Sequence, residues 1–379
     1  MRNSVTPSAR AAAALLLATS LGMPLQVSAQ EEPPASALIN QRSEETVEAA
    51  RAASIRSSEE TFAYFEGEVD EALRRAVERV WDPERPREPS PRTPWGDPDL
   101  RGFWVNGTYT PMERPVELAG KPLYSIQEAI EVFQGDVLRD ASVDPATVHY
   151  DWTEFGMDNW QSPIPPNRRT SLIFDPPNGR IPPLTAEGQE RWEAQARRDT
   201  LQSRHPTERC IVGSEGPPRV PFIQQIGESR IVQTPDYLVV IRQSNNDVRV
   251  IPLDGRPHPP ESVRAWLGMA RGHWEGDTLV IETKNFHPDR TWVRPRGLGG
   301  NLHLIERLTR VAEDLVIYQA TLTDPTTWEA PWSYEIPWPK MDPPGIFEWA
   351  CHEHNYGIIN VVRGAQVRAA EYEEAQSGN

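Results

Sequence analysis

The six residues from Cys351 to Tyr356 bring together more kinds of chemistry than any other stretch of this chain. They place a thiol, two imidazoles, a carboxylate, an amide and a phenol in consecutive positions. Residues 346–355 are predicted to form a β-strand, in which side chains at every second position share a face. His352, His354 and Tyr356 would then lie together, at a spacing that metal sites and acid–base sites both use.

Two kinds of chemistry and one structural interpretation fit this predicted strand. Glu348 falls on the same face as His352 and His354, and the three could supply ligands to a divalent metal such as zinc. Without metal, the two histidines and Tyr356 suit general acid–base catalysis, because imidazole titrates near neutral pH. In the third interpretation, these side chains only hold loops in place. The sequence leaves all three open.

Two carboxylates on other predicted strands are further catalytic candidates. Glu306 lies on an apolar strand face, where a carboxylate must be paired or protonated. Arg307 lies on the opposite face, so Arg249, Arg256 or a histidine of another strand is the expected partner. Glu282 lies on the strand face opposite Leu279 and Ile281 and is expected to face a cavity.

The chain has only two cysteines, Cys210 and Cys351. In an oxidising compartment such a pair most often forms a disulfide bond. We therefore expect the two to be bridged, which would make Cys351 structural. The alternative is two free thiols, with Cys351 forming a catalytic pair with a histidine.

The N-terminus predicts export. Arg2 and Arg10 form a basic n-region, residues 11–21 are apolar, and Val27-Ser28-Ala29 matches the small-x-small cleavage rule. The apolar run is shorter than the ~20 residues that a membrane-spanning helix needs. We predict a Sec-type signal peptide over 1–29 and a periplasmic or secreted mature chain that is not inserted in a membrane. A retained N-terminal anchor is the alternative.

Composition narrows the class of function. The formal net charge is −16, and such a surface repels nucleic acids and anionic membranes. The chain lacks a phosphate-binding glycine loop, a dinucleotide fingerprint, a nucleophile-elbow Gly-x-Ser-x-Gly motif and a His-Glu-x-x-His motif. A small molecule is therefore the expected partner, and the oligomeric state is open.

Helical patterns occur mainly before the β-rich part. Residues 41–80 combine paired charges with one apolar stripe and are predicted to be helical. A proline-rich connector follows, and shorter helices are expected at 125–133 and at 185–198, the latter capped by Thr185. Residues 151–183 are irregular and are interpreted either as a lid over a site or as a covering arm.

The second half predicts antiparallel β-structure. Short period-2 runs alternate with turns such as Asn245-Asn246-Asp247 and Glu275-Gly276-Asp277. The predicted strands cover 230–232, 237–242, 248–253, 272–274, 278–283, 301–310, 315–323, 332–336 and 346–355. We expect a mainly β fold, an antiparallel calycin-like barrel or curled sheet, with an appended N-terminal helical segment and long irregular loops. The expected division is a signal peptide (1–29), a helical segment with linker (30–94), one β-rich domain (95–370) and an acidic tail (371–379).

Several strings resemble a widespread exported protein family of Gram-negative bacteria. They are Asp99-Leu100-Arg101-Gly102-Phe103-Trp104, the run from Phe174 to Thr185, Gly272-His273-Trp274-Glu275-Gly276-Asp277-Thr278-Leu279-Val280, and Ala350-Cys351-His352-Glu353. The resemblance covers roughly residues 95–370. It implies export and a single β-rich body, and it carries no known activity or catalytic residue with it.

Two classes of function follow as expectations. The first is an exported lyase or hydrolase that acts on a small oxygenated ring or glycoside through a His/Glu/Tyr site in a barrel mouth. The second is a non-catalytic periplasmic binding protein for an apolar or aromatic ligand. Convergent histidines and carboxylates in the main cavity would favour the enzyme, and an apolar lining would favour the binding protein.

Overall fold

Antiparallel β-sheet forms the centre of the structure, as the sequence predicts. This computed structural model describes residues 69–141, 164–194, 201, 204, 206–212, 216–220, 228–288, 300–341, 345–353 and 355–377. The strands are β1 (Gly102–Trp104), β2 (Ile173–Asp175), β3 (Ser229–Gln233), β4 (Tyr237–Arg242), β5 (Val248–Pro252), β6 (Met269–Glu275), β7 (Thr278–Lys284), β8 (His303–Ala312), β9 (Leu315–Thr323) and β10 (Trp332–Pro339). The helices are α2 (Ile126–Ala141), α3 (Ala186–Ala194), α4 (Tyr356–Ser377) and the 3-10 turns η1 (Val116–Leu118) and η5 (Ser244–Asn246).

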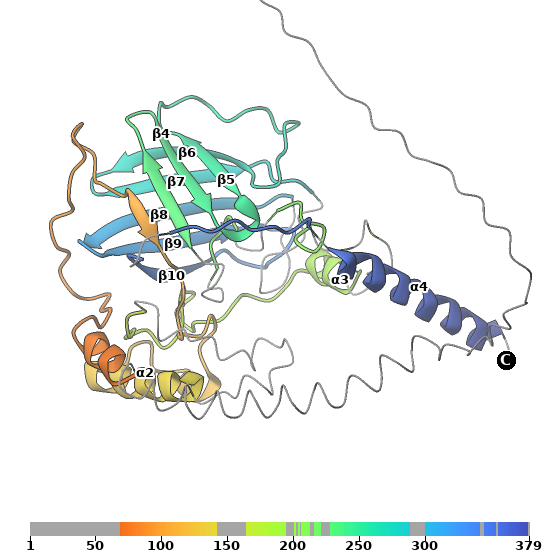
Figure 1. Cartoon of the computed structure of the whole chain (residues 1–379), viewed down its shortest axis with the longest axis horizontal. Helices are drawn as coiled ribbons and strands as arrows, with labels where there is room; N and C mark the ends of the chain where they lie inside the picture. The colour runs from red at the N-terminus through yellow and green to blue at the C-terminus, as the bar shows by residue number, and fades with distance from the viewer. Residues whose placement is uncertain are drawn as a thin grey trace, which may run out of the picture. The chain divides into compact units, whose positions relative to one another are not determined.

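The strands form two sheets and do not close into a barrel. One sheet has the order β1-β3-β4-β5 and the other the order β2-β10-β9-β8-β7-β6, and every pairing is antiparallel. Figure 1 shows β6 to β10 side by side in the larger, curled sheet. The curled-sheet form of the prediction is confirmed, and the closed calycin-like barrel is wrong.

Among the described residues, the edges of the two sheets approach each other at two places. An isolated bridge joins Trp104, at the end of β1, to Lys340, just beyond β10. At the other side, Gly272 of β6 lies against β5, where an added Cβ would stand 2.6 Å from a methyl carbon of Leu253. No ladder joins β5 to β6 in the described chain, so this seam is held by packing rather than by backbone hydrogen bonds.

The predicted turns are formed by the residues that favour them. Asn245 and Asn246 adopt positive φ angles of 58° and 51° between β4 and β5, which asparagine tolerates better than most residues. Gly276, with φ of 61°, turns the chain between β6 and β7. These tight turns fix the register, so the strand faces inferred from period-2 alternation are those observed.

Large aromatic residues fill the space between the sheets. Trp104, Trp332, Tyr318 and Tyr334 are the largest fully buried side chains, and they belong to one core with aliphatic residues of both sheets. The tryptophan-rich composition therefore serves packing to a large extent. Burying each such ring removes ~150–250 Å² of surface from water.

The described part of the irregular segment is a covering arm. Residues 164–183 contribute β2 and lie over the outer face of β10. Arg169 Nε donates to Glu335 Oε1 over 2.8 Å, and the Trp81 indole donates to the same oxygen over 2.9 Å. Glu335 is 3% exposed and ties the arm to the sheet, whereas 151–163 lie outside the described residues.

The structure corrects the predicted strand over 346–355. The described residues of this segment join no sheet and are held by side chains instead, as where Phe347 N donates to Gln243 Oε1 over 2.8 Å. Residues 371–377 of the expected acidic tail continue α4, whose described side chains (356–371) are all at least partly exposed. The alternation of aromatic residues was therefore a misleading strand signal.

The helical predictions hold where they can be compared. Of the helix predicted over 41–80, residues 69–77 are helical. Residues 41–68 and the predicted signal peptide lie outside the described chain. Helix α2 extends beyond the predicted 125–133, and Thr185 caps α3 by accepting a hydrogen bond from Gly188 N over 3.0 Å. Among the helices in the described ranges, none is long and apolar enough to cross a membrane.

Candidate functional site

A buried ion pair links the two sheets. Glu306 of β8 is 1% exposed, and Arg249 of β5 donates from Nη1 to its Oε1 over 2.9 Å and from Nη2 to its Oε2. This is one of the partners that the sequence predicted, and Arg307 instead pairs with Glu275 on the surface. Because an unpaired buried carboxylate is strongly disfavoured, Arg249 and Glu306 depend on each other.

Two further side chains complete the hydrogen bonding of Glu306. Tyr318 donates from Oη to Oε1 over 3.0 Å, and Thr283 lies 3.4 Å from Oε2. Both belong to strands that flank β8, diagonally across from Glu306, a separation that long side chains can span. Burial raises the pKa of Tyr318 well above its usual range, so the phenol stays protonated and acts as a donor.

The network continues to the segment 216–220. Arg219 N donates to Tyr318 Oη over 2.8 Å, and Tyr334 Oη donates to Arg219 O. The Arg219 guanidinium lies 5.4 Å from the ring of Trp338, a cation–π arrangement. The hydrogen-bond network around Glu306 therefore connects both sheets to the loop that contains Arg219.

A cavity of 420 Å³ lies beside this ion pair, at the starts of β5 and β6. Three segments form its wall: residues 211–212, residues 246–250, and residues 265–268 with Ala270. The pocket is open to solvent, and its apolar residues include Val212, Val248, Val250, Ala265, Trp266 and Leu267. Its polar members are Asn246, Asp247 and Arg249. Its size lies within the ~300–1,000 Å³ typical of small-molecule sites.

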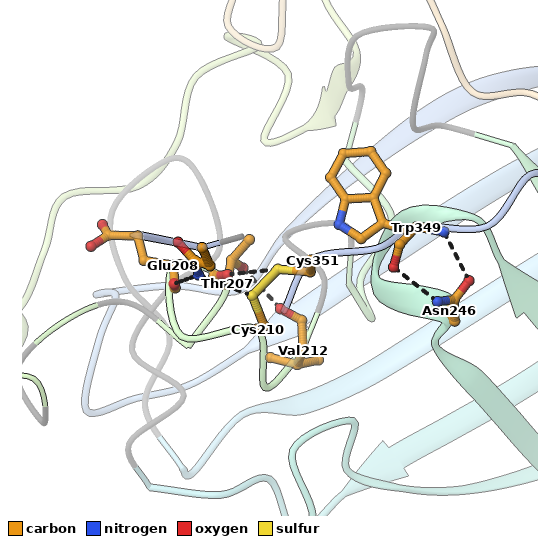
Figure 2. The surroundings of a disulfide bond; sticks show 8 residues. Thr207, Glu208, Cys210, Val212, Asn246, Trp349 and Cys351 are labelled. Atoms are coloured by element: carbon orange, nitrogen blue, oxygen red, sulfur yellow. Dashed lines mark hydrogen bonds between the residues drawn. A yellow bond between two sulfur atoms is a disulfide. The ribbon is translucent and has the colours of Figure 1, made fainter. Parts of the chain in front are cut away.

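The predicted disulfide is present and lies next to one wall of the cavity. Cys210 and Cys351 are bridged, with Cα atoms 5.7 Å apart, and Cys210 directly precedes the lining residues Ile211 and Val212. Figure 2 shows Asn246 bonded to the backbone of Trp349, two residues before Cys351: Nδ2 donates to Trp349 O over 3.0 Å, and Oδ1 accepts from Trp349 N over 3.3 Å. The C-terminal segment thus holds two of the three walls together.

Glu282 is at the centre of a second cluster, on the outer face of the larger sheet. Its Oε1 lies 2.7 Å from His303 Nε2 and 2.6 Å from Lys284 Nζ, and its Oε2 lies 3.1 Å from His258 Nε2. Glu282 does lie opposite Leu279 and Ile281 of β7, as predicted, but it is partly exposed and does not line the 420 Å³ cavity. Two imidazoles that share one carboxylate can hold and move protons.

The electrostatics of this cluster favour an ionised carboxylate. Burial alone would raise the pKa of Glu282, but hydrogen bonds from Lys284 and His303 outweigh it and lower the pKa to about 2. Burial lowers the pKa of His258 below its usual range, although Glu282 opposes this. Near neutral pH the cluster therefore contains a carboxylate with a mainly neutral His258.

The residues of the Cys351–Tyr356 run are not brought together at the cavity. Glu348 and His352 are exposed, and so is 65% of Tyr356, which begins α4. None of the three lines the 420 Å³ cavity, and His354 lies outside the described residues. No group of three or more His, Cys, Asp or Glu side chains in the described part of the chain is arranged to hold a metal ion. The metal and catalytic roles of this run stay predictions.

Sequence reasoning missed His258, His303 and Trp266. His258 and Trp266 lie in the long connection between β5 and β6, which was interpreted as turn and loop, and loop residues carry no period that assigns a face. His303 lies two residues from Ile305, the residue of β8 that pairs with Glu282, so the diagonal rule for antiparallel pairs could have found it once these two strands were paired.

Comparison of the chain with models of known protein families and with curated proteins finds no match. The resemblance to an exported family therefore rests on the quoted strings, and the candidate sites are interpreted from their own geometry.

Proposed function

We propose that this protein is exported and binds a small, mainly apolar molecule in the 420 Å³ cavity without transforming it. The observation that carries this proposal is the set of described lining residues, most of which are aliphatic or, in Trp266, aromatic, and none of which is a histidine. Apolar lining with a few polar groups is the usual character of small-molecule sites. The disulfide supports export, because such bonds persist mainly in oxidising compartments.

The test is binding of a neutral fluorescent probe, N-phenyl-1-naphthylamine, to the purified mature chain. Wild type should bind one molecule, and Val250→Trp should abolish binding because the larger side chain fills the cavity. Val116→Trp is the matched control, since Val116 is also an exposed valine (77%, against 53% for Val250) and does not line the cavity. Equal binding by both variants would place the site elsewhere.

The second candidate is the exported lyase or hydrolase, now with Glu282 as its acid–base centre. The specific observation in its favour is the pair of imidazoles on one carboxylate. If wild type turns over members of a panel of chromogenic glycosides and lactones, Glu282→Gln should lower the rate ~100-fold or more. A rate that this substitution leaves unchanged would exclude the cluster.

A further inference from the structure

The outer face of the four-stranded sheet is apolar and stays partly exposed in the described chain. Its side chains form two cross-strand rows, Val232–Val239–Val250 and Phe103–Arg230–Ile241–Val248. All of them are at least partly exposed, and none belongs to a hydrophobic cluster of the described residues. The solvent face of an antiparallel sheet is usually polar, and contiguous exposed apolar surface marks an interaction site.

Helix α4 has a second apolar surface of this kind. Steps of three and four residues place four side chains on one side of the helix: Ile358, Val362, Ala365 and Ala369. Every described side chain of α4 is at least partly exposed, and none belongs to a hydrophobic cluster of the described residues. Glycines and β-branched residues lower the intrinsic helix propensity of α4. Burial of this apolar stripe is therefore expected to stabilise the helix.

The start of α4 is fixed to another part of its own chain. Asn355, directly before the helix, donates from Nδ2 to Glu208 O over 3.2 Å and to Cys210 Sγ over 3.3 Å. Cys210 is in turn bridged to Cys351. With the helix attached in this way, the sheet face of the same chain stays exposed. A second copy carries both surfaces as well, so each copy can cover the sheet of the other.

The charges around the two surfaces are complementary. Arg363 and Arg368 flank the apolar stripe of α4, and both are exposed without an ion pair in the described chain. Acidic residues border the sheet face at its two ends. Asp236 lies in the β3–β4 turn, and Glu348 lies in the segment that Asn246 holds beside the β4–β5 turn. These two carboxylates are also exposed and have no ion pair within the described ranges.

From these observations we propose that α4 of a second copy of this chain packs its apolar stripe across the outer face of β3 and β4, reciprocally in a two-fold dimer. A helix layered on a sheet is a common arrangement in which both elements bury an apolar side. The small side chains of Ala365 and Ala369 let the helix approach the sheet closely. Val232, Val239 and Ile241 do not line the 420 Å³ cavity, so this contact goes beyond the proposed binding function and does not depend on it.

Light scattering after gel filtration should find the mature chain as a dimer. Val362→Glu in α4 and Val239→Glu in β4 should each weaken the dimer ~100-fold or more, because each places a charge in the apolar contact. Val367→Glu is the matched control, since Val367 is 57% exposed on the opposite side of α4, and this variant should stay dimeric. A monomeric wild type, or a Val239→Glu dimer as stable as wild type, would overturn the proposal.

A photo-cross-linker identifies the two surfaces without depending on how the variants fold. The mature chain is prepared with p-benzoylphenylalanine in place of Val362, as an equal mixture of ordinary and isotope-labelled chains. Cross-links should join α4 to outer-face residues of β3 or β4 in peptides of mixed isotope composition, which only two different copies can give. Cross-links within one chain, cross-links between two copies of α4, or the absence of any cross-link to this face would overturn the proposal.

Discussion

At the scale of single residues, Glu306 shows how far a sequence can predict a pairing. Its place on an apolar strand face requires a partner, and strand alternation removes the adjacent Arg307 from consideration. What could not be predicted is which of the remaining cations lies across the interior, because β5 and β8 belong to different sheets. Their approach depends on how the two sheets pack, and no local pattern encodes that.

The buried pair makes a prediction about stability. Arg249→Ala should lower the free energy of unfolding by ~3–5 kcal/mol, because it leaves the Glu306 carboxylate buried without its cation. The matched control is Arg307→Ala on β8, where the ion pair with Glu275 has side chains 40% and 48% exposed, and the expected loss is ~1 kcal/mol or less. Urea denaturation followed by fluorescence measures both. Equal losses would contradict the assignment of Glu306 as a core anchor.

The Glu282 cluster makes a prediction about pH. The pKa of Glu282 in the folded chain is about 2, below its ordinary value of 4.5. The unfolded chain therefore takes up a proton first, and stability from this carboxylate is lost as the pH falls from about 4.5 toward about 2. The lowered pKa of His258 acts in the same direction, with stability lost below about pH 6.5.

Melting temperatures measured from about pH 7 to about pH 3 should fall more steeply for wild type than for Glu282→Gln in the lower part of this range. His258→Gln is the companion variant, and it should flatten the upper part. If wild type and Glu282→Gln lose stability in parallel below about pH 4.5, the carboxylate does not have the low pKa assigned to it.

At the scale of elements, the strands with clear alternation and tight turns were predicted closely. Strand β9 has its predicted bounds, and β4 does as well. Strands β1 and β2 were missed because three residues are too few to show a period. Residues 346–355 show alternation without a partner edge, and they are held instead by side-chain amides: Phe347 N donates to Gln243 Oε1 over 2.8 Å, and Asn246 bonds to Trp349.

The disulfide is expected to stabilise the attachment of this C-terminal segment. The bridge closes a loop between residues 141 positions apart, worth ~4–5 kcal/mol in the chain-entropy model. The double variant Cys210→Ser/Cys351→Ser should therefore unfold at a lower urea concentration than wild type. Adding a phosphine reductant should bring wild type close to the variant and leave the variant unchanged. A variant as stable as oxidised wild type would show that Asn246 and its neighbours hold the segment without the bridge.

At the scale of the whole molecule, the disulfide fits the export that the N-terminal residues predict. Expression of the full chain in a Gram-negative host should yield a mature protein that begins at Gln30, because cleavage follows Ala29. Mass spectrometry of the periplasmic fraction measures this directly. Ala29→Trp should block processing, since the cleavage site requires small residues. Recovery of chain that still begins at Met1 from wild type would favour the retained anchor.

The sequence by itself determined the fold class, the disulfide, most strands and the need for a partner at Glu306. These depend on short-range rules, namely period-2 alternation, turn residues that tolerate positive φ, and the cost of an unpaired buried charge. The tertiary structure decided that the sheets stay open, that Arg249 is the partner of Glu306, and that the cavity is built from three distant segments. It also placed His352 at the surface, whereas Arg249 and Glu282 belong to networks of side-chain contacts. The physical reason is that a cavity is the space left after packing, and packing between sheets and loops depends on contacts that no single segment contains.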